Sequence, residues 1–409
     1  MAGDGQMSAP LSGLRVVDLT RYLAGAYTTM ILGDLGAEIL KIENPEGGDG
    51  SREVGPFVNG VSTYFLSVNR GKKSIAVDLK HPAGREIVLD LIATADVVVE
   101  NFVPGTVDRL GIGFEDSKKR NARVIYASCS GFGQTGPFAE KRAFDMLIQG
   151  MAGTISITGE PDRPPVRVGF SIGDIAAAQF LATGILAALH RRDRDGKAQR
   201  VEVGMLDCQL ALLENAFSRY LNAGEKPQRE GRRHPVATPM QVIATQDGYM
   251  CLAVGNDQQW HRFCVALQRP ELAEDARFLT NKDRTRNRDQ LENLLVEILV
   301  TRPTDDWVAL LERHGVPAGP VNTIDRVARH PQVVARDMIV ALEHPRTGRF
   351  RVVNTPIRIE GRSARPSIAA PDLGEHTEDV LKNVLHLADE RIAQLLAQRA
   401  VAPASAEQD

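Results

Sequence analysis

Hydrophobic and polar residues follow two alternating patterns along the first half of the chain. Short apolar runs, such as LRVVDL at 14–19, EILKIE at 38–43 and DVVVEN at 96–101, are typical of buried strands. Between them, at 28–37 and 84–95, the apolar residues recur at helical spacing. Two more strands are expected in VIYASCSGFG and RVEVGM, at 124–133 and 200–205. Strands that alternate with helices predict an α/β fold with a doubly wound parallel sheet.

The pattern changes after a polar, proline-containing stretch at 224–239, which predicts a linker. Two apolar runs within 241–255 meet at Asp247-Gly248, a dipeptide typical of a tight hairpin. Helical spacing follows between 258 and 314, and another hairpin is expected around Thr347-Gly348. These patterns predict a smaller α+β domain at 225–330, between a first domain at 1–224 and a C-terminal stretch at 331–409.

Length, charge and cysteine usage narrow the class of protein. The 409 residues exceed what one hydrophobic core usually accommodates, and the net charge of −3 leaves no basic footprint for nucleic acid or an anionic membrane. The four cysteines form no CxxC pair and no HExxH occurs, so no metal site is predicted, and Cys129, Cys208 and Cys251 are expected to be buried. The apolar run at 175–190 is interrupted by polar residues, and the N-terminus lacks a signal-peptide pattern. We therefore expect a cytoplasmic protein without a membrane span.

Ligands of open parallel sheets bind outside the carboxyl ends of the strands. Here those ends are followed by segments rich in glycine, asparagine and charge: TRYLAG at 20–25, ENPEGGDG at 43–50, ENFVPG at 100–105 and SGFGQTGP at 130–137. The first of these is not GxGxxG, so the dinucleotide fingerprint is missing. We expect the functional site at this edge of the sheet.

Basic residues lie near the same strand ends. By composition the segment 69–81 is a solvated loop, but arginine and lysine also bind phosphates by charge and hydrogen bonds. No single basic segment is specific, yet together they indicate an anionic ligand that carries phosphates. The residues are Arg70, Lys72, Lys73, Lys80, Arg109, Lys141 and Arg142.

A lone acid, Asp174, precedes the clearest helical pattern, in VGFSIGDIAAAQF at 168–180. Aspartate before an apolar helical run is a preferred N-cap, and this interpretation is favoured by spacing alone. A carboxylate at a helix N-terminus also meets partial positive charge, which keeps it ionised, as a nucleophile must be. The small neighbours Gly173, Ala176 and Ala177 leave room for a bulky electrophile.

Several of these segments resemble the class III CoA-transferases, the family of formyl-CoA transferase and carnitine CoA-transferase. The resemblance runs from Leu11 to about Val384 and is carried by the number and order of its motifs. These are LSGLRVVDLTRYLAGAYTTMILGDLGAEILKIENPEGGD, NRGKKSIAVDLK, ADVVVENFVPGTVDRLGIG, SGFGQTGP, GILAALHRRDRDGKAQ, VEVGMLD and HGVPAGPVN.

The resemblance implies a fold and a mechanism. Two chains would interlock as a homodimer, each with a Rossmann-like large domain built from both termini and a small central domain. Asp174 would be both cap and nucleophile, passing through an aspartyl anhydride and an aspartyl-CoA thioester, while a small-domain loop, here 255–260, covers the site. Asn44 stands where formyl-CoA transferases have an arginine. The residues implied to contact CoA are Leu23, Ala24, Asn69, Arg70, Lys72, Asn101, Phe102, Arg109 and Arg142.

The sequence leaves more than one substrate and reaction open. NRGKKSIAV, GFGQTGP and GNDQQW look closer to the succinyl-CoA–glutarate branch, which implies succinyl-CoA as donor and a dicarboxylic acceptor, whose distal carboxylate Arg52, Arg232 or Arg233 would bind. An α-methylacyl-CoA racemase is the runner-up, but 142–145 lacks the histidine of that branch. The sequence is also compatible with a non-catalytic CoA-binding protein and with a thioester hydrolase.

Overall fold

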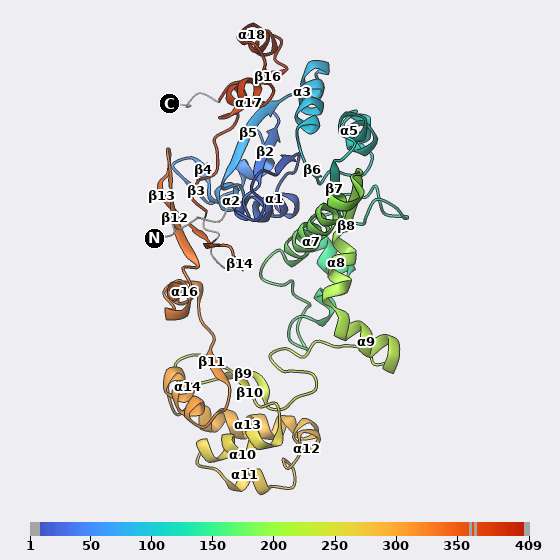
Figure 1. The fold of residues 1–409 in the computed structure, drawn as a ribbon. Coiled ribbons are helices and arrows are strands. Elements are labelled where there is room, and N and C mark those ends of the chain that lie inside the picture. Colours follow the sequence, from blue (N-terminus) through green and yellow to red (C-terminus); the bar gives the residue numbers. More distant parts are fainter. Residues whose placement is uncertain (1–8, 360–361, 364–365, 405–409) are drawn as a thin grey trace. The chain divides into compact units, whose positions relative to one another are not determined.

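A seven-stranded sheet organises the larger part of the computed structural model (Figure 1), which describes residues 9–359, 362–363 and 366–404. All neighbouring strands are parallel except for one antiparallel edge strand, β16. Without that edge strand, the order is that of the Rossmann fold, which reverses between β1 and β6. Across the sheet the strands are β16 (Val401–Ala402), β5 (Lys72–Val77), β2 (Glu38–Glu43), β1 (Arg15–Asp18), β6 (Val97–Glu100), β7 (Ile125–Ser130) and β8 (Gln199–Gly204).

Both faces of this sheet are covered by helices, because alternate strand residues point to opposite sides. Val17 and Val98 pack with α3 (Pro82–Ala93), α17 (Thr377–Asn383) and α18 (Asp389–Ala397) on one face. Val16 and Val99 pack with α1 (Ala24–Asp34), α7 (Ile172–Asp195) and α8 (Met205–Leu212) on the other. The remaining helices here are α2 (Thr63–Val68), α4 (Thr106–Arg109), α5 (Phe114–Arg120), α6 (Asp145–Met151) and α16 (Pro331–Ala335).

The expectation of a solvated loop at 69–81 is wrong, because the middle of this segment, Lys72–Val77, is the strand β5. Its strand lies between β2 and β16, and Lys72, at its first position, is buried. Because Lys72 and Lys73 are charged, the sequence pattern did not indicate a strand here, although Ile75 and Val77 of this strand are buried in the core. By contrast, the strands predicted from 14–19, 38–43, 96–101, 124–133 and 200–205 are confirmed as β1, β2, β6, β7 and β8.

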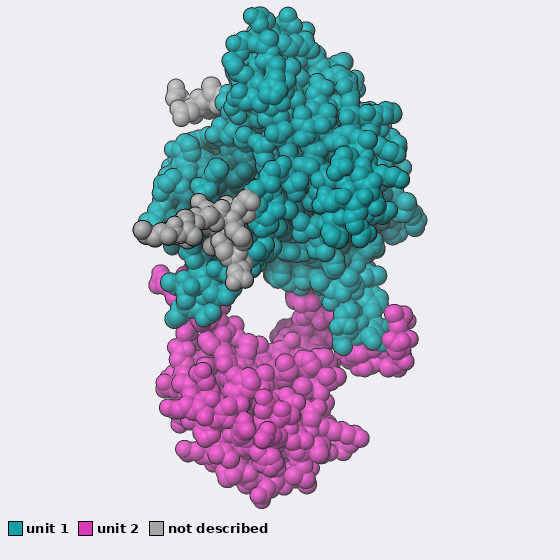
Figure 2. Space-filling model, in the orientation of Figure 1, with its two compact units in different colours: residues 1–154, 168–218, 331–409 teal, residues 155–167, 219–330 magenta. Residues whose placement is uncertain are grey.

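The chain divides into two units (Figure 2), residues 1–154, 168–218 and 331–409 in one and residues 155–167 and 219–330 in the other. The predicted boundaries differ in two respects. The central unit begins at 219 rather than 225, and the excursion 155–167, assigned by the sequence to the large domain, groups with it. The helix α9 (Glu214–Ala223) crosses the first boundary, which is why its composition gave no break there.

The second unit is a small antiparallel sheet packed on helices. Trp260 and Phe263 lie at the centre of its core and are fully buried. The expected hairpin at 241–255 is confirmed, but Cys251 is exposed, because it alternates with the buried Met250 and Leu252. The strands are β9 (Met240–Ala244), β10 (Tyr249–Ala253) and β11 (Ala318–Pro320), and the helices are α10 (Asp257–Ala266), α11 (Glu271–Glu274), α12 (Asn281–Arg286), α13 (Arg288–Leu299), α14 (Thr304–Arg313) and α15 (Ile324–Val327).

Short hairpins complete the first unit. The expected turn at Thr347-Gly348 joins β12 (Ile339–His344) to β13 (Gly348–Val353). The smaller ones pair β3 (Phe57–Val58) with β4 (Val61–Ser62), and β14 (Arg358–Ile359) with β15 (Arg362–Ser363). By length and composition α7 is apolar enough to cross a membrane, contrary to the expectation from its sequence, but in this fold it packs against the sheet.

Candidate active site

Two loops meet where the strand order reverses. One follows β1 and the other follows β6, and the Asn101 side chain joins them: its oxygen accepts from the Arg21 N–H and its amide donates to the Arg21 carbonyl, both at 2.8 Å. Gly25 at the start of α1 allows this approach, since a Cβ there would collide with the Thr20 side chain. The two loops therefore form one rigid edge at the place where Rossmann-type sheets bind ligands.

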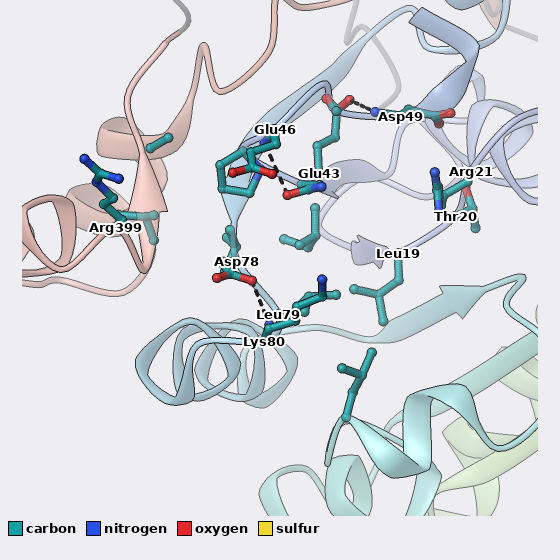
Figure 3. Close-up of a pocket in the computed structure, with 18 of the residues that line it drawn as sticks. Leu19, Thr20, Arg21, Glu43, Glu46, Asp49, Asp78, Leu79, Lys80 and Arg399 are labelled. Atoms are coloured by element: carbon teal, nitrogen blue, oxygen red, sulfur yellow. Dashed lines mark hydrogen bonds between the residues drawn. The ribbon is translucent and has the colours of Figure 1, made fainter.

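A cavity of about 620 Å³ opens beside these loops (Figure 3). Of the residues implied to contact CoA, Phe102 lines it directly, and Asn44 lies in the same wall. This volume is in the range of small-molecule sites. The lining residues come from the ends of β1, β2 and β5, the loop after β6 and the C-terminal segment, and they include Leu19, Thr20, Arg21, Glu46, Asp78, Leu79, Lys80, Leu110, Leu396, Arg399, Val401 and Pro403.

The loop after β1 rests on buried charges. The Lys41 ammonium donates to the Thr20 carbonyl at 2.9 Å and pairs with the Asp49 carboxylate at 2.8 Å. The other oxygen of Asp49 accepts from the Tyr22 N–H at 3.0 Å. Because all these groups are satisfied by one another, they fix the course of residues 20–22 rather than reach a ligand.

A second buried pair lies beneath the same loop. The Lys72 ammonium is 3.0 Å from a carboxylate oxygen of Asp18, and both side chains are fully buried. Burial opposes the charge of Asp18, but the ammonium groups of Lys72 and Lys41 and hydrogen bonds from Thr20 and Thr29 lower its pKa to about 2. Burial in turn lowers the pKa of Lys72 to about 8. The pair is part of the interior.

Three residues implied to contact CoA are therefore placed inside the protein. Lys72 bonds to Asp18, Arg70 pairs with Asp34 at 2.6 Å, and the Asn69 side chain donates to a carbonyl of α2. None of the three lines the cavity beside the strand ends. Of the four basic residues expected at 69–81 to form a cradle for phosphates, only Lys80 lines the cavity. Arg70, Lys72 and Lys73 pair with acidic side chains and hold β5 to its neighbours.

Asp174 is in the first turn of α7, but it is not the cap. The N-cap position is Ser171, which makes no side-chain capping bond. Instead, a carboxylate oxygen of Asp145, in the first turn of α6, accepts from the Gly173 N–H at 2.7 Å. The prediction of Asp174 as a cap is thus wrong. The Gly173 N–H donates to Asp145 of another helix, so the Asp174 carboxylate is not used as a capping group.

The environment of Asp174 shifts its ionisation. Burial raises its pKa to about 7, and the negative charge of Asp145 acts in the same direction. No hydrogen bond to the Asp174 carboxylate occurs within the described part of the chain. The helix N-terminus was expected to keep this acid ionised, whereas burial and the neighbouring acid raise its pKa. A carboxylate of this kind is poorly solvated and correspondingly reactive.

Asp145 is itself held in place by a glutamine. Its second oxygen accepts from the Gln149 amide at 2.6 Å, and the oxygen of that amide accepts from the Val168 N–H at 2.9 Å. Gln149 is fully buried. The segment from 168 to the tip of α7 is therefore fastened to α6 at both ends, which fixes where Asp174 lies.

Leu23 and Tyr64 are in the surroundings of Asp174. Ile175, the next residue of α7, and Tyr64 both pack against the apolar cluster that contains Leu23. Burial together with the Asp174 charge raises the pKa of the Tyr64 hydroxyl. Ala24, also implied to contact CoA, is buried against the neighbouring core. The loop after β1 thus extends from the cavity to the helix that carries Asp174. Tyr64 is absent from our sequence-based prediction, because an aromatic residue in TYFLSV is typical of a hydrophobic core.

The predicted basic residues have different environments. Arg109 and Arg142 are exposed, and Arg109 donates to the Thr106 hydroxyl at 3.1 Å. Arg52 forms two hydrogen bonds to Glu43, at 2.8 Å each. Arg232 and Arg233 share Glu292 in the second unit. The three arginines proposed to bind a distal carboxylate therefore already have acidic partners.

The segment expected to cover the site is largely helical. Asn256 caps α10, its side chain accepting from the Gln259 N–H at 2.9 Å, and Trp260 is fully buried. Only Gly255 and Asn256 precede the helix. Among the described residues, no group of three or more histidine, cysteine or acidic side chains is arranged to hold a metal ion.

A doubly wound sheet with a cavity at its switch point and a desolvated acid on an adjacent helix tip is the arrangement of an α/β enzyme that acts on a nucleotide-sized ligand. The chain belongs to CoA-transferase family III, whose model matches residues 11–377. It is therefore an enzyme of a family that uses CoA thioesters as substrates, as the resemblance implied.

Individual relatives are similar over nearly the whole chain. The chain is 40% identical to the succinyl-CoA:glutarate CoA-transferase of Mus musculus over 388 residues, 95% of this chain and 89% of the relative. It is 40% identical to the succinate–glutarate CoA-transferase of Agrobacterium fabrum, covering 91% of this chain and 95% of that one. A crystal structure of a CAIB/BAIF family protein from Brucella suis superposes with a TM-score of 0.84 at 40% identity, covering 92% of this chain and all of that chain.

Proposed function

We propose that this enzyme transfers CoA from succinyl-CoA to a dicarboxylic acid, with Asp174 as the nucleophile. The observation that carries the proposal is the Asp174 carboxylate itself, which is desolvated, lacks a hydrogen-bond partner in the described structure and lies on a helix tip fixed by Asp145. Relatives named for succinyl-CoA and glutarate support the choice of donor and acceptor.

The first half of the reaction loads CoA onto the enzyme. A carboxylate oxygen of Asp174 attacks the thioester carbonyl of succinyl-CoA, the C–S bond breaks, and a mixed anhydride and the CoA thiolate result. The thiolate then attacks the Asp174 side-chain carbonyl, which releases succinate and leaves an aspartyl-CoA thioester. Covalent catalysis divides one difficult exchange into steps with lower barriers.

The second half reverses these events with the acceptor. A carboxylate of the acceptor attacks the aspartyl thioester, which forms a second anhydride and frees the thiolate. Attack of the thiolate on the acceptor carbonyl gives the new acyl-CoA and restores the Asp174 carboxylate. Every step conserves the thioester's free energy, provided that water is excluded from the anhydrides. The partial burial of Asp174 supports such exclusion.

The test is an exchange assay with matched variants of α7. Succinyl-CoA and glutarate should yield glutaryl-CoA and succinate in the wild type and in Asp195→Asn, which changes an exposed acid at the far end of the same helix. Asp174→Asn should yield none. Release of free CoA without acyl transfer would favour a hydrolase, epimerisation of a 2-methylacyl-CoA would favour a racemase, and CoA binding without any turnover would favour a binding protein.

We also propose that two copies of the chain assemble. Apolar side chains on and beside α6 support this idea, since Phe144, Met146, Leu147 and Phe170 are all substantially exposed. Charged replacements such as Met146→Glu should shift the mass measured by light scattering from twice that of the chain towards that of a single chain. A wild-type protein that elutes as a single chain would contradict the proposal.

A further inference from the structure

The C-terminal segment after the family-matched region reaches the cavity. Helix α18 ends at Ala397, and two residues later Arg399 has a left-handed backbone with a φ of 55°. The N–H groups of Arg399 and Ala400 donate back to the carbonyls of Leu396 and Leu395, both at 3.0 Å. This is the Schellman arrangement that ends many helices. It turns the chain so that β16 pairs with β5 and closes one wall of the cavity.

Arginine is an unusual residue for this position. The residue after the cap of a Schellman turn is most often glycine, because a Cβ disfavours positive φ by roughly 1 kcal/mol. Non-glycine residues in such conformations cluster at functional sites, where the side chain has a use. Gln268 has a similar positive φ after α10, so the backbone conformation alone assigns no role to Arg399. The position of its side chain at the cavity is what sets it apart.

The guanidinium of Arg399 makes no hydrogen bond or ion pair with the residues that the structure describes. It lines the cavity together with Lys80 and Arg21, whose side-chain nitrogens are equally without acidic partners in the ranges 9–359, 362–363 and 366–404. Figure 3 shows Arg399 at the margin of the cavity, on the C-terminal segment. The lining therefore contains three cationic side chains, and that of Arg399 reaches a ligand by turning inward from the margin.

Four acids also line the cavity, but they do not cancel these cations. Glu43 and Asp49 already pair with a basic side chain outside the lining, at 2.8 Å each. The other two are Glu46 and Asp78, and Asp78 accepts from the Lys80 N–H at 2.8 Å. The three free cations thus outnumber the two remaining acids, which favours an anionic ligand.

The rest of the lining fits a nucleotide. Apolar side chains provide a surface for a base, among them Leu79, Phe102, Leu110 and Val401. Asn44, in the same lining, is polar but uncharged, and the C-terminal segment contributes the cation Arg399.

We propose that Arg399 binds a phosphate group of CoA. The inference rests on the proposed function, because CoA is the phosphorylated ligand. Arginine suits this role, since its planar guanidinium forms paired, charge-assisted hydrogen bonds to phosphate. The segment that follows the family-matched residues is then part of the substrate site.

The experiment replaces Arg399 with glycine, the residue that the backbone conformation favours. Arg399→Gly should fold at least as well as the wild type, with an equal or higher thermal midpoint, yet bind CoA about tenfold or more weakly by titration calorimetry. Loss of affinity without loss of stability cannot come from a structural role. Arg391→Ala, on the exposed side of α18 and away from the cavity, is the matched control and should bind CoA as the wild type does.

Dephospho-CoA distinguishes the phosphates. Weaker binding of CoA with unchanged binding of dephospho-CoA assigns Arg399 to the 3′-phosphate, whereas equal losses for both assign it to the diphosphate. Unchanged affinity of Arg399→Gly for both ligands would overturn the inference. Because CoA binding is measured directly, an enzyme that binds CoA but does not exchange it with glutarate would refute the proposed function and leave Arg399 testable.

Discussion

Asp174 has the environment of a reactive group rather than of a stabilising one. Removing a half-buried carboxylate that lacks a hydrogen-bond partner among the described residues should stabilise the fold and abolish the chemistry. Asp174→Asn is expected to lose at least about a thousandfold in exchange activity and to gain about 0.5–2 kcal/mol in the free energy of unfolding at pH 8. Urea titration and the exchange assay on the same preparation check both. A variant that loses activity together with stability would assign Asp174 a structural role.

The pKa of Asp174, raised to about 7 by burial and by Asp145, also predicts the pH dependence. Protonated aspartic acid is not a nucleophile, so kcat/KM should rise as the pH passes through about 7 and then level off. In Asp145→Asn the charge beside Asp174 is gone while an oxygen still faces the Gly173 N–H, so the rise should move to lower pH.

Asp116→Asn, which neutralises an acid on α5, is the control and should keep the wild-type profile. A wild-type rate that is already constant from pH 5 to 8 would show that Asp174 is ionised throughout this range, contrary to the raised pKa.

At the scale of elements, the two loops at the switch point act as one through Asn101. Asn101→Ala removes both hydrogen bonds to Arg21, each worth about 0.5–1.5 kcal/mol. We expect the KM for succinyl-CoA to rise about tenfold with a smaller change in kcat, because the loop that forms the cavity edge loosens while Asp174 stays fixed. Steady-state kinetics with the acceptor in excess would measure this. A fall in kcat at unchanged KM would place Asn101 at the chemical step instead.

Much of the element order could be predicted from the sequence, and the exceptions have physical causes. Apolar runs revealed β1, β2 and β6, but β5 begins with Lys72, whose charge is cancelled in the fold by Asp18, 54 residues away. The cap of α7 was missed for a similar reason. The acceptor for Gly173 is Asp145, 28 residues earlier in the chain, and no local pattern reports such a partner.

The candidate site was predictable in part. Asp174 and the loops after β1 and β6 follow from helical spacing, the rule for strand ends and the family motifs. The ionisation of Asp174 and the position of Arg399 at the cavity do not, since they depend on burial and on a C-terminal turn that no motif marks. Contacts between distant segments are what the sequence lacks.

For the molecule as a whole, we expect the buried pair of Lys72 and Asp18 to be needed for stability against unfolding. Removing one partner leaves an uncompensated buried charge, so Lys72→Met should cost about 3–5 kcal/mol in the free energy of unfolding. Lys73→Met, on the same strand but partly exposed, should cost less than about 1 kcal/mol. Urea titration of both variants checks this. Weaker CoA binding by Lys72→Met at unchanged stability would support the direct contact between Lys72 and CoA that the resemblance implied.

The proposed mechanism requires that CoA becomes covalently attached to Asp174. Mass spectrometry detects this attachment directly. The intact protein is measured after incubation with succinyl-CoA, and peptide mapping then locates the adduct. The mechanism predicts an increase by the mass of a CoA thioester, carried by the peptide that contains Asp174 and absent from Asp174→Asn. Turnover of succinyl-CoA and glutarate by a wild-type enzyme that never carries the adduct, or an equal adduct on Asp174→Asn, would contradict it.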